Sequence, residues 1–334
     1  CVVTGRLCSV ISCRERDWTG YCSGLSPTFI NMRSIASSVL ASPTGTLPIR
    51  ADAPRTAAVG RVGTLALEFL RQGARTVFGR TSCRAPWHLL PPIYLDESGS
   101  AYAILVNPSG GLVGGDRLAI DLSIGAEAHA LISTPSANRV YRSLSREAVQ
   151  KVTIAVADGG ILEWMPEHTI PFAGSRFRQS IDVTLGAGAT LVLWDAVASG
   201  RIAHGERWRF TSLNNSIRMT MPSQATIREH YALAPGERPG GIGRIEEWDY
   251  LGSLFIVGDG MPGPLCDSLE TELADILDKH YGRVLGGVSQ PAAPGVVVKL
   301  VARSAPAMHQ VLMELWAAVR DVLWQMPPAT LRKY

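Results

Sequence analysis

The stretch "DRLAIDLSIGAEAHALIST", residues 116–134, decides the fold. Apolar side chains occupy every second position from Leu118 to Ile124, which is the period of a β-strand with one face in a core. Gly125-Ala126 interrupts the alternation, and a second apolar run follows it. The pattern predicts two strands joined by a tight turn.

The same unit occurs twice more along the chain. "QKVTIAVADGGILEW" (150–164) and "SIDVTLGAGATLVLWD" (180–195) each carry an alternating run, a glycine turn and a second apolar run. The spacing of about 30 residues is typical of sheets built by repetition. We interpret the three units as hairpins and predict a mainly β protein of stacked sheets, like a β-helix or a sandwich. Strands do not alternate with helices here, which argues against a doubly wound α/β fold.

Further elements lie on both sides of these units. "GTLALEFLRQGARTVFGR" (63–80) predicts two strands around Gly73, and "GVVVKLVAR" (295–303) predicts another strand. Apolar residues at helical spacing predict two α-helices in the C-terminal part, near 266–282 and 305–326. Asp267 or Ser268 is expected to cap the first helix and Gly282 to end it.

The first 55 residues differ from the rest of the chain. They are rich in Ser, Thr, Pro and Ala and show no sustained period, and four of the six cysteines lie within residues 1–22. We expect 1–55 to be a disordered or non-native extension with a true start at Met32, and 56–334 to form the β-rich domain. The few cysteines in that domain favour a cytoplasmic protein.

Charge and hydropathy exclude two classes of protein. The formal net charge of +3, with 18% charged residues, is too low for a nucleic-acid binder with a concentrated basic face. No apolar run reaches the roughly 18 residues of a membrane-spanning helix. We therefore expect neither a nucleic-acid partner nor a membrane partner.

The glycine-rich loop "NPSGGLVGGDRL" (107–118) resembles a phosphate loop at first sight. A phosphate loop needs a following Lys and Ser or Thr at the start of a helix, whereas here Asp116 follows and a strand comes next. The loop instead predicts a close crossing of two backbones, where only glycine fits.

Four stretches together carry a resemblance to a known family. They are "NPSGGLVGGDRL" (107–118), "TPSANRVYRS" (134–143), "LEWMPEHTIPFAGSRF" (162–177) and "LWDAVASGRIAHGERW" (193–208). In this order and spacing they resemble the UreD (or UreH) family of urease accessory proteins, over roughly residues 60–330.

This resemblance implies a scaffold rather than an enzyme. Proteins of that family bind apo-urease and, with UreF and the GTPase UreG, assist nickel insertion into the urease active site. Their C-terminal helical part contributes to the UreF contact, and a water-filled passage through the body has been proposed as the nickel route. The resemblance thus implies no tightly bound cofactor and only transient handling of Ni²⁺.

Polar residues within the apolar motifs are the candidates for such a route. A buried carboxylate such as Glu163 or Asp195 needs compensation, either from an arginine (Arg139, Arg176 or Arg201) or from a hydrated path. A conduit must bind its ion weakly, so scattered carboxylates and single histidines suit transit better than storage. The candidate nickel-path residues are Glu163, Asp195, Glu167, His168, His204, Glu206 and Asp116.

Two further groups are candidates for partner contacts. Arg139, Tyr141 and Arg201 combine residue types that are frequent in interfaces, and Arg201 and Glu206 could instead pair with each other. Part of the stripe of the last predicted helix is expected to stay exposed for a helical partner, which predicts poor solubility of the isolated chain. That part comprises Leu315, Trp316, Val319, Leu323 and Trp324.

One alternative function remains open. A stacked β protein could also be a carbohydrate-active hydrolase, which would show an open cleft lined by aromatic side chains and paired acids. The scaffold instead predicts a polar interior channel and broad apolar outer faces.

Overall fold

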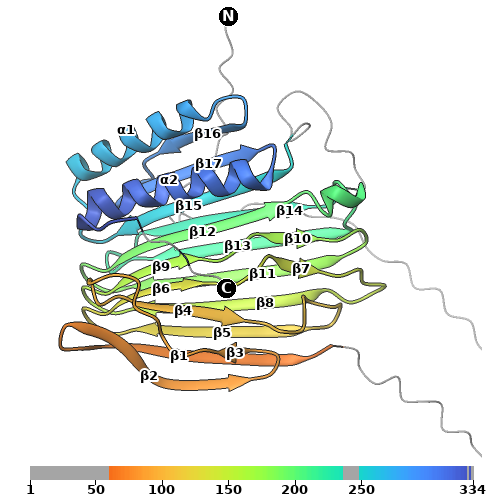
Figure 1. Ribbon diagram of the computed structural model, residues 1–334, viewed down its shortest axis with the longest axis horizontal. Coiled ribbons are helices and arrows are strands. Elements are labelled where there is room, and N and C mark those ends of the chain that lie inside the picture. Colours follow the sequence, from red (N-terminus) through yellow and green to blue (C-terminus); the bar gives the residue numbers. More distant parts are fainter. Residues whose placement is uncertain (1–59, 236–247, 329–330, 332–334) are drawn as a thin grey trace, which may run out of the picture. The chain divides into compact units, whose positions relative to one another are not determined.

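The computed structural model describes residues 60–235, 248–328 and 331. The extension predicted for residues 1–55, with its start at Met32, lies outside the described residues. Two β-sheets and two helices make up the described part (Figure 1). The predicted class, mainly β with stacked sheets and two C-terminal helices, is confirmed.

The two sheets have the following strands, in the order in which they pair. The first has seven: β14 (Thr226–Leu233), β13 (Ser212–Thr220), β11 (Arg176–Leu185), β8 (Ala148–Val156), β5 (Arg117–Ile124), β1 (Val62–Gln72) and β2 (Arg75–Arg84). The second has ten: β16 (Val284–Ser289), β17 (Gly295–Ala302), β15 (Tyr250–Gly258), β12 (Thr190–Ala198), β9 (Ile161–Met165), β6 (His129–Ser133), β4 (Ala101–Val106) and β3 (His88–Leu89), with β10 (Thr169–Pro171) beside β12 and β7 (Asn138–Val140) beside β10.

The interpretation of the three repeated units as hairpins is wrong. β5 and β6 are joined by the turn at Gly125, yet they do not pair with each other. β5 pairs in parallel with β1 and β8, and β6 pairs in parallel with β4 and β9. Each turn therefore carries the chain from one sheet to the other, and successive units stack in parallel. The two strands predicted around Gly73 are confirmed as β1 and β2, and they pair antiparallel.

Three layers follow from the burial pattern. One apolar core lies between the two sheets, and a second lies between the ten-stranded sheet and the helices. β5 buries only alternate residues, because its other face meets solvent. β12 is buried from Leu191 to Ala198, because it has the first sheet on one face and the helical layer on the other.

The helices α1 (Gly263–Lys279) and α2 (Ala305–Trp324) lie near β15, β16 and β17 (Figure 1). The predicted capping of the first helix is wrong, because Asp267 and Ser268 lie inside it. Its N-cap is Pro262. The helix ends at Lys279 with His280 as its C-cap, so Gly282 lies beyond the end of the helix. A proline in the first turn suits a helix start, since its missing N–H would have no partner there. Ser304 caps α2 by accepting a hydrogen bond from the backbone N–H of Ala307.

Candidate functional site

A row of polar side chains crosses the seven-stranded sheet on its inner face. Gln150, Gln179, Asn215 and Tyr231 occupy matching positions on β8, β11, β13 and β14. Gln150 Nε2 donates to Gln179 Oε1 (3.2 Å), and Gln179 Nε2 donates to Asn215 Oδ1 (3.2 Å). Register thus assembles one hydrogen-bonded row from four strands, of which only β13 and β14 follow each other directly in the sequence.

Asp195 faces this row from β12 of the other sheet. Its carboxylate accepts hydrogen bonds from Gln179 Nε2 (2.9 Å), Asn215 Nδ2 (2.7 Å) and the Tyr231 hydroxyl (3.1 Å). Burial raises the pKa of Asp195, and these three donors oppose that rise. Burial also raises the pKa of the Tyr231 phenol well above its usual value, and the Asp195 charge adds to the rise.

The polar contacts continue from Asp195 along the second sheet. Ser253 on β15 stands opposite Asp195 in register, and Lys299 on β17 stands opposite Ser253. Lys299 Nζ donates to Ser253 Oγ (2.9 Å) and pairs with Glu229, which reaches across from β14. The space between the sheets therefore contains a polar layer with both acidic and basic groups.

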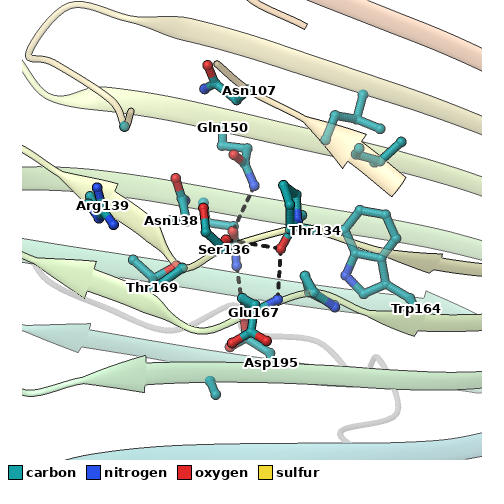
Figure 2. Close-up of a pocket in the computed structure, with 18 of the residues that line it drawn as sticks. Asn107, Thr134, Ser136, Asn138, Arg139, Gln150, Trp164, Glu167, Thr169 and Asp195 are labelled. Carbon is teal, nitrogen blue, oxygen red and sulfur yellow. Dashed lines mark hydrogen bonds between the residues drawn. The ribbon is translucent and has the colours of Figure 1, made fainter. Parts of the chain in front are cut away.

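A cavity of about 100 Å³ opens beside Asp195 at one end of this layer (Figure 2). The lining is polar on several sides and is contributed by all four stretches that carry the family resemblance: Gly110 and Gly111, Thr134 to Arg139, Glu167 and Thr169, and Asp195. Figure 2 also draws the hydrogen bond between the Thr134 side chain and the backbone of Glu167 (2.9 Å).

Two tryptophans also line the cavity, Trp87 and Trp164. Both indole N–H groups are buried, and neither has a hydrogen-bond partner among the described residues. Buried polar groups in proteins are nearly always satisfied by protein or by ordered water. A cavity of this volume and polarity has room for several water molecules.

The glycine-rich loop forms one edge of the cavity and is a close backbone crossing, as predicted. The Leu112 N–H donates to the Arg139 carbonyl oxygen (2.7 Å), which brings the loop onto β7. Gly111 has φ of +150°, and a Cβ added there would lie 2.4 Å from the Arg139 carbonyl oxygen. Asp116 anchors the loop, because its carboxylate accepts from the backbone N–H groups of Arg61 (2.7 Å) and Val113 (2.9 Å).

Glu163 lies on the opposite face of the ten-stranded sheet from Asp195 and points toward α2. It accepts hydrogen bonds from Arg320 Nη1 (2.8 Å) and Trp316 Nε1 (2.5 Å), and His129 Nε2 lies 2.7 Å from it. Glu163 and Arg320 are both fully buried. Arg320 Nη2 also donates to Asp96 Oδ2 (2.9 Å), so this cluster connects four segments of the chain: the loop with Asp96, β6, β9 and α2.

The expected arginine partners of these two acids are not the ones observed. Glu163 pairs with Arg320, and Asp195 is held by two amides and a phenol. Arg201 pairs instead with Glu206, through two hydrogen bonds from one guanidinium edge. That contact, with a hydrogen bond from the Ala173 N–H, lowers the pKa of Glu206 to about 2.

The remaining candidate residues lie in separate places. Glu167 lines the cavity and approaches His168, whose Nδ1 lies 3.5 Å from its carboxylate. His168 also packs edge-on against Tyr250, with ring centroids 5.4 Å apart. His204 is exposed in the short 3₁₀-helix Ile202–His204. The structure thus places Asp195, Glu167 and Arg139 around one cavity, and it places Glu163, Asp116 and His204 elsewhere.

The expectation of an exposed stripe on α2 needs a correction. Leu315, Trp316 and Val319 are at most 1% exposed, because they form part of the core between α2 and the ten-stranded sheet. Only Leu323 and Trp324, near the end of the helix, are half-buried. A partner-binding role for these two stays a prediction.

Sequence reasoning missed Gln150, Gln179, Asn215 and Arg320. Each has a signal in the sequence. The two glutamines and the asparagine occupy inward positions of strands whose residues alternate between inward and outward, and the inward positions two residues before and after them are apolar. Arg320 follows Trp316 by four residues and so lies on the buried stripe of α2. A polar residue at an apolar position of a periodic pattern indicates a buried polar contact.

Two general features complete the description. In residues 60–235 and 248–328, no group of three or more His, Cys, Asp or Glu side chains lies close enough to hold a metal ion. Neither α1 nor α2 is long and apolar enough to cross a lipid bilayer.

The fold and the cavity define a class: a two-sheet protein of parallel stacked arches with a polar interior, covered on one face by two helices. The chain belongs to the UreD urease accessory protein family, whose model matches residues 61–333. A urease accessory protein UreD of Cupriavidus pinatubonensis is 32% identical over 80% of this chain and 92% of its own length. The urease accessory proteins UreD of Alkalilimnicola ehrlichii (30% identical over 84% of this chain and 94% of its own length) and Haloarcula marismortui (31% identical; 82% and 91%) are also similar.

Proposed function

We propose that this protein is a non-catalytic scaffold of urease maturation in the cytoplasm. It binds apo-urease and, with UreF and UreG, assists insertion of nickel into the urease active site. Membership of the UreD family supports the accessory role. The polar interior supports a part in the passage of the ion.

The observation that carries the proposal is the acid-lined cavity at the end of the inter-sheet polar layer. Asp195 and Glu167 line it, together with hydroxyl and amide groups. Such oxygen ligands bind a divalent cation weakly when they are few and scattered, which suits an ion in transit. The two indole N–H groups in the wall have no hydrogen-bond partner in the described part of the chain, which favours a hydrated cavity, and water would fill the remaining positions around the ion.

The alternative function, a carbohydrate-active hydrolase, has less support. Glycosidases place two carboxyl groups on either side of a bound sugar. Here three hydrogen-bond donors hold Asp195, and Glu163 faces the other side of the sheet. Relatives that match most of the chain are named accessory proteins.

The test is urease activation in cells that contain urease and the other accessory proteins but lack this chain. We expect the wild-type chain to restore activity and nickel content, and the D195N/E167Q variant to restore less of both while still co-purifying with urease and UreF. D182N is the matched control, because Asp182 pairs with Arg218 on the outer face of the seven-stranded sheet. Full activation without the chain would refute the accessory role. Full nickel loading by D195N/E167Q would refute the passage through this cavity.

A further inference from the structure

An open depression of about 660 Å³ lies next to the cavity and is not explained by passage of an ion. It is formed by the end of β7, the turn after β10 and the loop that contains the 3₁₀-helix. Its principal lining residues are Tyr141, Arg142, Phe172, Arg201, Glu206 and Arg209. We call it the basic depression.

The floor of the basic depression is held in place by its own contacts. The Tyr141 ring packs edge-on against Phe172, with centroids 5.0 Å apart. The guanidinium carbon of Arg201 lies over the Phe172 ring, 4.4 Å from the ring centroid, and Arg201 also pairs with Glu206. The floor is therefore an ordered aromatic surface, and its one ion pair is electrically neutral.

Two cations on the rim have no compensation. Arg142 and Arg209 are exposed, and neither guanidinium forms an ion pair or hydrogen bond with any residue in the part of the chain that the structure describes. Two exposed arginines on the outer face of the seven-stranded sheet do have acidic partners: Arg178 pairs with Glu147 and Arg218 with Asp182. The rim of the basic depression therefore carries a net positive charge.

An exposed apolar side chain follows Arg142 closely in the sequence. Leu144 is 88% exposed, two residues after Arg142 in the sequence. A partner side chain that covers Leu144 would remove its apolar surface from water, which favours binding. Arg and Tyr are also the residue types most enriched at the centres of interfaces.

We propose that the basic depression docks an acidic segment of a protein partner. Carboxylates of the partner pair with Arg142 and Arg209, and an apolar side chain of the partner covers Leu144. The inference rests on the proposed function in one respect: the partner is a member of the urease maturation assembly. The site is open and shallow, which suits a protein surface better than a small oxyanion, whose sites are enclosed.

The basic depression and the cavity share one residue at their border. The Tyr141 hydroxyl donates to the Gly110 carbonyl oxygen (3.1 Å), and Gly110 lines the cavity. Tyr141 is therefore shared between the floor of the depression and the rim of the cavity. A partner docked on the depression lies beside the cavity, where an ion could pass between the two proteins.

The experiment measures binding of the full-length chain to apo-urease, to UreF and to UreG, each alone and together, at low and high salt. We expect the charge reversal R142E/R209E to weaken one of these contacts by roughly tenfold or more and to reduce its salt dependence. L144S should weaken the same contact without changing its salt dependence. The control K151E/R228E makes the same change of charge at exposed strand positions and should bind like the wild type.

Each other result has a definite meaning. If R142E/R209E melts at the wild-type temperature and binds every partner normally, the docking inference is overturned and the accessory function stands. If the wild-type chain binds none of the three proteins, the accessory function fails and takes the inference with it. If R142E/R209E loses only saturable binding of inorganic phosphate, the site takes a small oxyanion and the inference is overturned.

Discussion

Ionisation of the buried Asp195 makes the stability of the folded protein depend on pH. The pKa of Asp195 is raised by burial, so the unfolded chain, in which that pKa is near 3.8, releases the proton first. The protonated acid therefore contributes stability that is complete below pH 3.8 and is lost as the pH rises through the folded pKa.

We therefore expect D195N to gain stability relative to the wild type as the pH increases, because asparagine cannot ionise. The measurement is the free energy of unfolding of both proteins from pH 3.8 upward, with D182N as the control on an exposed strand face. A difference between D195N and the wild type that stays constant over this range would show that Asp195 ionises as easily in the folded protein as in the unfolded one.

Glu163 and Arg320 provide a second test at single residues. Both are fully buried, so removal of one leaves the other charge without its main partner. We expect the single substitutions E163L and R320M each to lower the free energy of unfolding by about 3–5 kcal/mol. E163L/R320M should cost clearly less than the sum of the two single substitutions, because it leaves neither charge of the pair behind. Chemical denaturation of the four proteins gives the cycle, and additive losses would mean that the pair does not interact.

Among the elements, the helix ends make a direct comparison possible. Ser304 caps α2 through the Ala307 N–H, whereas Ser268 lies exposed inside α1. We expect S304A to lose about 1 kcal/mol of stability, as is typical when an N-cap is removed. S268A should change it by less than about 0.5 kcal/mol, like most surface substitutions. Thermal unfolding measures both, and equal losses would argue against the cap.

The glycine crossing is tested in the same way. G111A places a methyl group 2.4 Å from the Arg139 carbonyl oxygen at a φ of +150°. We expect a loss of about 1–3 kcal/mol and a disturbed cavity edge. Gly287 on β16 is the control, because a Cβ there meets nothing within 4 Å. A G111A variant as stable as G287A would show that the loop can move away from β7.

The strands show how far alternation can be read from the sequence. From Leu118 to Ile124 it identifies the strand and the buried face, since both follow from a period of two. It does not identify the neighbour, because an arch and a hairpin place the same residues inward. For that reason the turn at Gly125 was correctly predicted and the pairing of β5 with β6 was not.

At the scale of the whole molecule, the candidate site was only partly predictable. The motif acids Asp195 and Glu167 are conspicuous in the sequence, because charged residues in apolar stretches require a partner or water, and both line the cavity; their place on a nickel path stays a prediction. Their neighbours Gln150, Gln179 and Asn215 come together only through strand register, which no local pattern encodes. Glu163 was grouped with Asp195, although an intervening sheet separates their environments.

The layered architecture leads to a final prediction about truncation. α2 covers the outer face of the ten-stranded sheet, where Trp194, Val298 and Leu300 belong to the core it completes. A chain that ends at residue 303 would expose that face to water, and we expect it to aggregate. Removal of residues 1–55 should leave the melting temperature unchanged, because their sequence shows no sustained apolar period of the kind that a core element needs. Size-exclusion chromatography and thermal unfolding of the two truncated chains test this. A soluble, cooperatively folded chain without α2 would mean that the two sheets form an independent domain and the helical layer is an addition to it.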